Sequence, residues 1–233
     1  MTTAPADSRL PAARRLSILG RVRPLADFYE RRLRERFGMK TARVYAFGLA
    51  VSYGVLALFA SGAGARAARD LVVRELLAAS WVVAGLAALS LATNLSRLDA
   101  EQGVEGLLAQ RGTSREELGV ARWFVGARRI AFLVAASALA VCAAAALRMK
   151  SLSDAAALSA LAVAAMIYAL VLGASVSALA RASATLAPSN GRTLLVALVF
   201  VPHAARALWP DLPSIPAVFS SLLKLVARAG GLA

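Results

Sequence analysis

The sequence predicts an all-α, polytopic membrane protein with six transmembrane helices, and its composition and charge pattern indicate this class. Of the 233 residues, 59% are hydrophobic and only 17% are charged, and the mean hydropathy is +0.65. Soluble domains are about 45–50% apolar and about 25% charged, so the composition excludes an ordinary cytosolic enzyme. The apolar residues also form long uncharged runs, and roughly 20 such residues cross a bilayer core of about 30 Å as a helix.

The charge and the cysteine content narrow the class of partner. The net charge of +14 comes from 27 Lys and Arg residues against 13 Asp and Glu residues. Because this charge lies beside long apolar runs, it predicts contact with a lipid bilayer and not with nucleic acid. The single cysteine, Cys142, cannot form an intrachain disulfide and matches no metal-ligand spacing, so we expect no metal site.

Two segments precede the first predicted span. Residues 1–23 contain Ala, Arg and Pro without a strong period, which predicts a flexible basic tail. Residues 24–42 have apolar residues at helical spacing and a proline suited to the first turn, which predicts a basic amphipathic helix lying on the membrane surface. It is either an anchor that fixes topology or a docking surface for a cytoplasmic partner. The residues expected to make its contacts are Leu25, Phe28, Arg32 and Phe37.

Charged residues delimit six predicted spans within residues 43–233. The four long ones are residues 44–65, 76–96, 130–147 and 155–180. None of these four contains Asp or Glu, which argues against a proton-coupled carrier. The last two, residues 192–209 and 213–229, are shorter and contain prolines, so they either cross fully or re-enter at their shared outer end.

The distribution of basic residues predicts the orientation of the spans. With the N-terminus inside, the cytoplasmic segments hold 21 of the 27 Lys and Arg residues. Positive residues favour the cytoplasmic side. The sequence therefore predicts that both termini are cytoplasmic.

The loop at residues 97–118, between spans two and three, is predicted to form a short helix, a sharp turn and a second helix that continues into span three. Either Thr113 with Glu116 or Ser114 with Glu117 forms a capping box that starts the second helix. A passive connection between spans needs only a few residues, so the length of this loop favours a contact surface. The alternative is a solvated loop with no partner.

The residues of this loop carry a resemblance to a known family. The run Asp99-Ala-Glu-Gln-Gly103-Val-Glu105-Gly-Leu-Leu, followed by Thr113-Ser114-Arg115, resembles the membrane subunit of type-2 ABC exporters. Within that group the chain is most similar to the permease family associated with haem export in cytochrome c maturation. A looser match covers residues 172–202, and the resemblance extends over roughly residues 25–210.

The resemblance implies a permease that forms the translocation pathway in the bacterial cytoplasmic membrane and pairs with a second permease subunit, identical or similar. A separate ATPase subunit would bind ATP and Mg²⁺, since this chain lacks a phosphate-binding loop and is not expected to be an enzyme by itself. The loop residues expected to contact the ATPase are Asp99, Glu101, Gly103, Glu105, Leu108, Arg111 and Arg115. The alternative function is a non-transporting membrane scaffold or assembly factor.

Three polar residues of the predicted spans are candidates for the pathway: Asn94, Ser175 and His203. Each has a plainer interpretation as a residue that satisfies its hydrogen bonds between helices. His203, the only histidine, could also bind haem iron. A lone histidine without a second ligand is weak support, and the long basic tail and Ala-rich spans depart from the haem-associated pattern, so we expect no directly bound cofactor.

Overall fold

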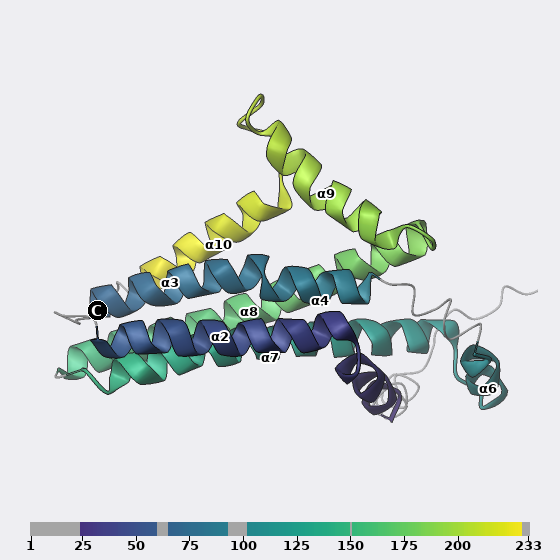
Figure 1. Ribbon diagram of the computed structural model, residues 1–233, viewed down its shortest axis with the longest axis horizontal. Coiled ribbons are helices and arrows are strands. Elements are labelled where there is room, and N and C mark those ends of the chain that lie inside the picture. The colour runs from purple at the N-terminus through teal and green to yellow at the C-terminus, as the bar shows by residue number, and fades with distance from the viewer. Residues whose placement is uncertain (1–23, 60–64, 93–101, 150, 230–233) are drawn as a thin grey trace, which may run out of the picture.

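The computed structural model describes residues 24–59, 65–92, 102–149 and 151–229 (Figure 1). The predicted tail at residues 1–23 lies outside these ranges, as do the predicted site residues Asn94, Asp99 and Glu101. Within the described ranges all regular secondary structure is helical, which confirms the predicted all-α class.

The described part of the chain begins with a helix over residues 24–34, and eight labelled helices follow it there. These are α2 (Phe37–Phe59), α3 (Ala65–Trp81), α4 (Val83–Leu91), α6 (Val104–Gln110), α7 (Arg115–Ala146), α8 (Leu152–Leu186), α9 (Gly191–Ala205) and α10 (Ile215–Ala229).

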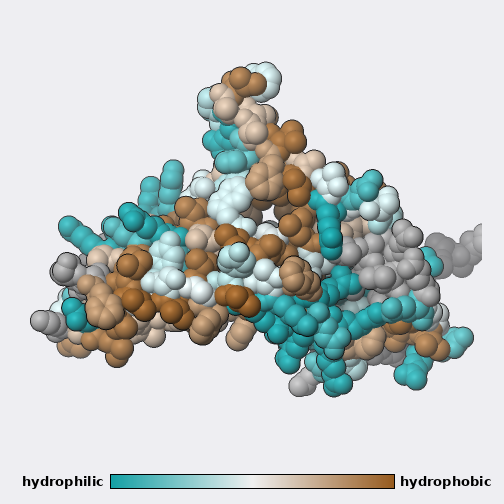
Figure 2. Space-filling model, in the orientation of Figure 1, coloured by the Kyte–Doolittle hydropathy of each residue, from teal (hydrophilic) through white to brown (hydrophobic). Residues whose placement is uncertain are grey.

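A bundle of long helices forms the body of the molecule. In Figure 1, α2, the α3–α4 pair, α7 and α8 run roughly alongside one another. Four segments are long and apolar enough to cross a membrane: Phe37–Phe59, Arg66–Leu91, Arg115–Ala146 and Leu152–Leu186. One end of the bundle carries the helix 24–34 and α6, and Figure 2 shows hydrophilic side chains gathered there. We call this the platform end, and we call the opposite end, where α2 leads to α3 and α7 leads to α8, the hairpin end.

The tightest helix pair in the bundle is α7 with α8. A Cβ added at Gly173 would lie 2.5 Å from the Ala127 carbonyl oxygen and 2.9 Å from the Ala131 nitrogen, so only glycine permits this approach. Two hydrogen bonds fix the register, because Ser177 Oγ donates to Trp123 O at 2.9 Å and Trp123 Nε1 donates to Ala174 O at 3.1 Å. These contacts make α7 and α8 one rigid unit.

The N-terminal amphipathic segment differs from the predicted single helix over 24–42. The first helix ends at residue 34, and α2 begins at Phe37, whose side chain is 84% exposed. The break has a local cause: Arg36 Nη1 donates to Ser90 O at 3.1 Å, and a Cβ at Gly38 would lie 3.2 Å from Leu86 O. The connection is thus held against α4, and Phe37 does not belong to the amphipathic helix.

The second span starts earlier than the predicted residue 76. The apolar helix begins at Arg66 and continues through α3 and α4 to Leu91. The N–H of Val82 donates to Ala78 O at 2.9 Å, so the helical hydrogen bonding runs on between α3 and α4. The helix that includes the second predicted span therefore contains Asp70 and Glu75 in its first half.

The two C-terminal helices form a chevron against one face of the bundle. Gly191 at the start of α9 lies against Ala92 and Ala184, and α9 then diverges from the bundle toward an apex at residues 206–214. From that apex α10 approaches the bundle again and ends near the start of α3, at the hairpin end (Figure 1).

This arrangement differs from the predicted fifth and sixth spans. Each helix has 15 residues, about 22 Å at 1.5 Å per residue, which is less than the roughly 30 Å of a bilayer core. Together they make one angled passage from the platform end to the hairpin end. In the structure, α10 ends at the hairpin end, opposite the helix 24–34 (Figure 1).

Candidate functional site: a polar platform and an apolar cavity

The helix 24–34 is fastened to α7 by one carboxylate. Glu30 pairs with Arg34 on its own helix at 2.9 Å, and with Arg128 and Arg129 on α7. The Glu30 side chain is only 13% exposed, so solvent screens these ion pairs weakly. No local sequence pattern identifies Glu30, because its partners on α7 lie about a hundred residues away in the chain.

Apolar and aromatic contacts complete this attachment. Leu25, Tyr29 and Leu33 are buried, as the amphipathic pattern predicts for one face of the helix. The guanidinium of Arg122 on α7 lies 5.1 Å from the centre of the Tyr29 ring, a cation–π geometry. The predicted surface helix therefore packs one face on protein.

The same helix also contacts the loop that precedes α6. Arg32 donates a hydrogen bond to Gln102, and its guanidinium lies 5.5 Å from the centre of the Phe28 ring. The structure thereby places Arg32 and Phe28 beside the start of the α6 segment, which is about seventy residues away in the sequence. We call the helix 24–34, α6 and residues 115–122 of α7 the platform.

The turn from α6 into α7 is defined by two left-handed glycines and a capping box. Gly103 has φ 69° before α6, and Gly112 has φ 75° after it. Ser114 Oγ accepts from the Glu117 N–H at 3.1 Å, and the Glu117 side chain accepts from the Ser114 N–H at 2.9 Å. Of the two predicted capping boxes, the Ser114–Glu117 pair is the one that forms.

The predicted contact residues on the platform differ in exposure. Gly103, Arg111 and Arg115 are exposed, whereas Leu108 is half-buried. Of Glu105, the structure describes only its place within α6. The neighbouring Leu107, which the prediction did not include, is 62% exposed. This exposed mixture of arginines and leucine is available for contact with another protein.

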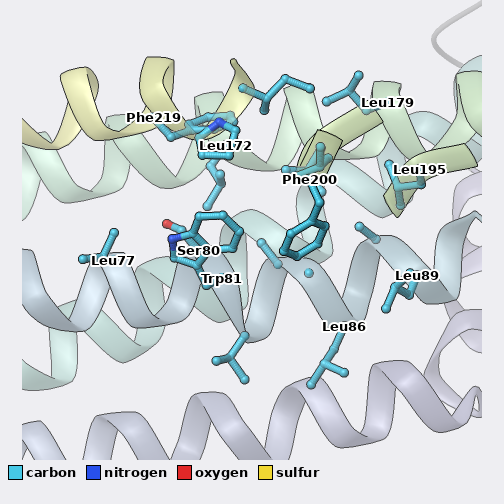
Figure 3. A pocket seen from close by; sticks show the side chains of 18 of the residues that line it. Leu77, Ser80, Trp81, Leu86, Leu89, Leu172, Leu179, Leu195, Phe200 and Phe219 are labelled. Atoms are coloured by element: carbon cyan, nitrogen blue, oxygen red, sulfur yellow. The ribbon is translucent and has the colours of Figure 1, made fainter. Parts of the chain in front are cut away.

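A cavity of about 550 Å³ lies between the bundle and the chevron (Figure 3). Its lining comes from α2, α3, α4, α8, α9 and α10. Aromatic side chains narrow it, with the rings of Trp81 and Phe200 5.8 Å apart and those of Tyr168 and Phe219 6.3 Å apart. No charged residue is among the described residues that line it.

Of the predicted pathway residues that the structure describes, one lies beside this cavity and one does not. His203 is exposed on α9, and its ring lies 5.7 Å from that of Trp81, which lines the cavity. Ser175 is half-buried on α8 and does not line the cavity. No local sequence pattern identifies Trp81 and Tyr168, which line the cavity together from helices far apart in the chain.

The comparisons add no relative to these observations: no protein-family model, no curated protein and no solved structure matches the chain.

Proposed function

We propose that this chain is the permease subunit of an ATP-driven exporter, driven by a cytoplasmic ATPase that docks on the platform. The observation that carries the proposal is the contact of the helix 24–34 with both the α6 segment and α7. A partner that moves this platform acts on the membrane-spanning bundle directly. The sequence resemblance to type-2 exporters supports the same assignment, with a second permease subunit beside this one in the bacterial cytoplasmic membrane.

The route for such a movement is α7. This helix runs without interruption for 32 residues from the exposed Ser114 capping box toward the hairpin end. It is joined to α8 by the hydrogen bonds of Trp123 and Ser177, and to the helix 24–34 by Glu30. A displacement at Arg115 therefore moves α7, α8 and the N-terminal helix together, because no break lies between them.

Charge reversal on the platform tests the docking role. The chain is co-expressed with a candidate ABC ATPase subunit from the same genome, and Arg111→Glu and Arg115→Glu are introduced singly. Each reversal replaces an exposed cation of the proposed interface with an anion, which repels the acidic groups that a complementary ATPase surface would present. This repulsion slows association and weakens the free energy of binding by several kcal/mol at most. We expect co-purification of the ATPase and stimulation of its ATP turnover to fall by about tenfold.

Arg148→Glu is the matched control, since Arg148 is also exposed but lies at the hairpin end. It should leave both measurements unchanged. If neither platform variant weakens co-purification or turnover, the docking role is wrong. If the ATPase binds normally but the chain never alters its turnover, the scaffold function takes its place.

A further inference from the structure

The cavity beneath the chevron has the chemistry of a site for a hydrocarbon chain. The polar side chains in its lining are confined to hydroxyl groups, apart from the Trp81 indole, and the lining includes Leu77, Leu172 and Val199. Ligand sites of this size, a few hundred to about a thousand Å³, are mostly apolar with few polar groups. A charged or strongly polar ligand would lose its water there without gaining partners.

The two central hydroxyl groups already satisfy each other. Tyr168 Oη and Ser80 Oγ are 2.7 Å apart, and Ser80 Oγ donates to Leu76 O at 2.6 Å. Since the single Ser80 proton goes to Leu76, Tyr168 is the donor in the pair. Neither of these two hydroxyls therefore has a proton left to donate to a ligand.

The chevron leaves this surface within reach of lipid. Between its apex and the bundle, Figure 2 shows a hollow bordered largely by hydrophobic side chains. On α9, Phe200 is 52% exposed and Val201 is 63% exposed, and on α10, Val218 is 57% exposed. Helices that lie in a bilayer expose such residues to acyl chains.

We propose that this cavity binds a single hydrocarbon chain of a membrane phospholipid, held against Trp81, Tyr168 and Phe219. The site lies between the two ends of the bundle, at the depth where acyl chains lie. This inference stands apart from ATPase coupling, because the binding requires only this chain.

Gly85 allows the cavity to be filled without disturbing the bundle. It lines the cavity, and a Cβ at this position would have no heavy atom within 4 Å. Gly85→Leu therefore adds its Cβ without a clash and extends an isobutyl side chain from the wall of the cavity. Gly48→Leu is the matched control: an added Cβ on Gly48 also has nothing within 4 Å, but Gly48 is exposed on α2 and does not line the cavity.

The full-length chain is reconstituted in phosphatidylcholine nanodiscs with increasing fractions of phosphatidylglycerol that carries a diazirine near the end of one acyl chain. After photolysis, mass spectrometry maps the labelled peptides. A bound chain gives labelling of the Trp81, Tyr168 and Phe219 peptides that saturates at a low probe fraction. Bulk lipid gives labelling that rises in proportion to probe, as expected at Phe47 and Phe132, which are 72% and 63% exposed.

We expect Gly85→Leu to need roughly tenfold more probe for half-maximal labelling of the cavity peptides, since its side chain displaces about two methylene groups of the ligand. Gly48→Leu should leave that value unchanged. Normal labelling at Phe47 and Phe132 in both variants shows that they are folded. The proposal is overturned if cavity labelling is absent or rises linearly with probe, or if folded Gly85→Leu saturates like the unaltered chain.

Discussion

Glu75 is a buried carboxylate in a helix that is long and apolar enough to cross a membrane. It lies within α3, and its side chain is fully buried. By donor–acceptor geometry, neither of its carboxyl oxygens makes a hydrogen bond among the described residues, and the nearby polar side chain is the Ser137 hydroxyl. An unsatisfied buried polar group costs about 1–3 kcal/mol, and intramembrane carboxylates are commonly retained for function.

Replacing this carboxylate should stabilise the fold. We expect Glu75→Leu to raise the free energy of unfolding by about 1–3 kcal/mol, because it removes two unsatisfied oxygens and adds apolar contact. Thermal unfolding in detergent measures the change. Asp70→Leu is the control on the same helix, where an exposed side chain should give less than about 0.5 kcal/mol. A loss of stability in Glu75→Leu would contradict this expectation and mean that the carboxylate is satisfied in the fold, with the Ser137 hydroxyl as the first partner to examine.

Gly173 marks the closest approach of two helices, and a methyl group there should be costly. A Cβ would stand 2.5 Å from a backbone oxygen of α7, which cannot move alone. We expect Gly173→Ala to destabilise the chain by about 1–3 kcal/mol in the same unfolding measurement. Gly85→Ala, with open space around its Cβ, should instead gain up to about 1 kcal/mol from helix propensity. Equal stabilities of the two variants would contradict the observed packing.

At the scale of elements, the start of α7 depends on the Ser114 cap. Ser114→Ala removes the acceptor for the Glu117 N–H, which should cost about 1 kcal/mol and allow the first turn to open more often. Hydrogen exchange at the Glu117 amide should then become about fivefold faster. Thr113→Ala should change it little, since Thr113 is not the cap. Faster exchange in both variants alike would show that the loop as a whole, and not the cap, holds this turn.

The elements with local signals were those that the sequence could predict. The capping box and the glycine after α6 use neighbours in the chain, so the turn into α7 was foreseen. The start of the helix that includes the second predicted span was not, because counting residues between charges sets a limit at Glu75, whereas the helix begins at Arg66. The role of Glu30 could not be predicted either, because its ion pairs with Arg128 and Arg129 form only when the chain folds.

At the scale of the whole molecule, the chevron determines on which side the C-terminal helix ends. Cysteine labelling with a membrane-impermeant maleimide can test this, because the only native cysteine, Cys142, is buried. With the platform inside, we expect Arg228→Cys to react in intact cells and Arg111→Cys to react only after permeabilisation. Arg148→Cys, at the hairpin end, should react like Arg228→Cys. Equal protection of Arg228→Cys and Arg111→Cys would restore the six-span arrangement with both ends inside.

The length of the chevron helices also imposes an order of assembly during synthesis. Neither α9 nor α10, at 15 residues, offers the insertion machinery a stretch long enough to enter the bilayer unaided. Both helices therefore need to pack against α3 and α8, which are synthesised first. Chains truncated after residue 186 should therefore integrate into membranes, whereas residues 187–233 expressed alone should stay in the cytosolic fraction. The last fifth of the protein thus becomes a membrane segment only through the part that precedes it.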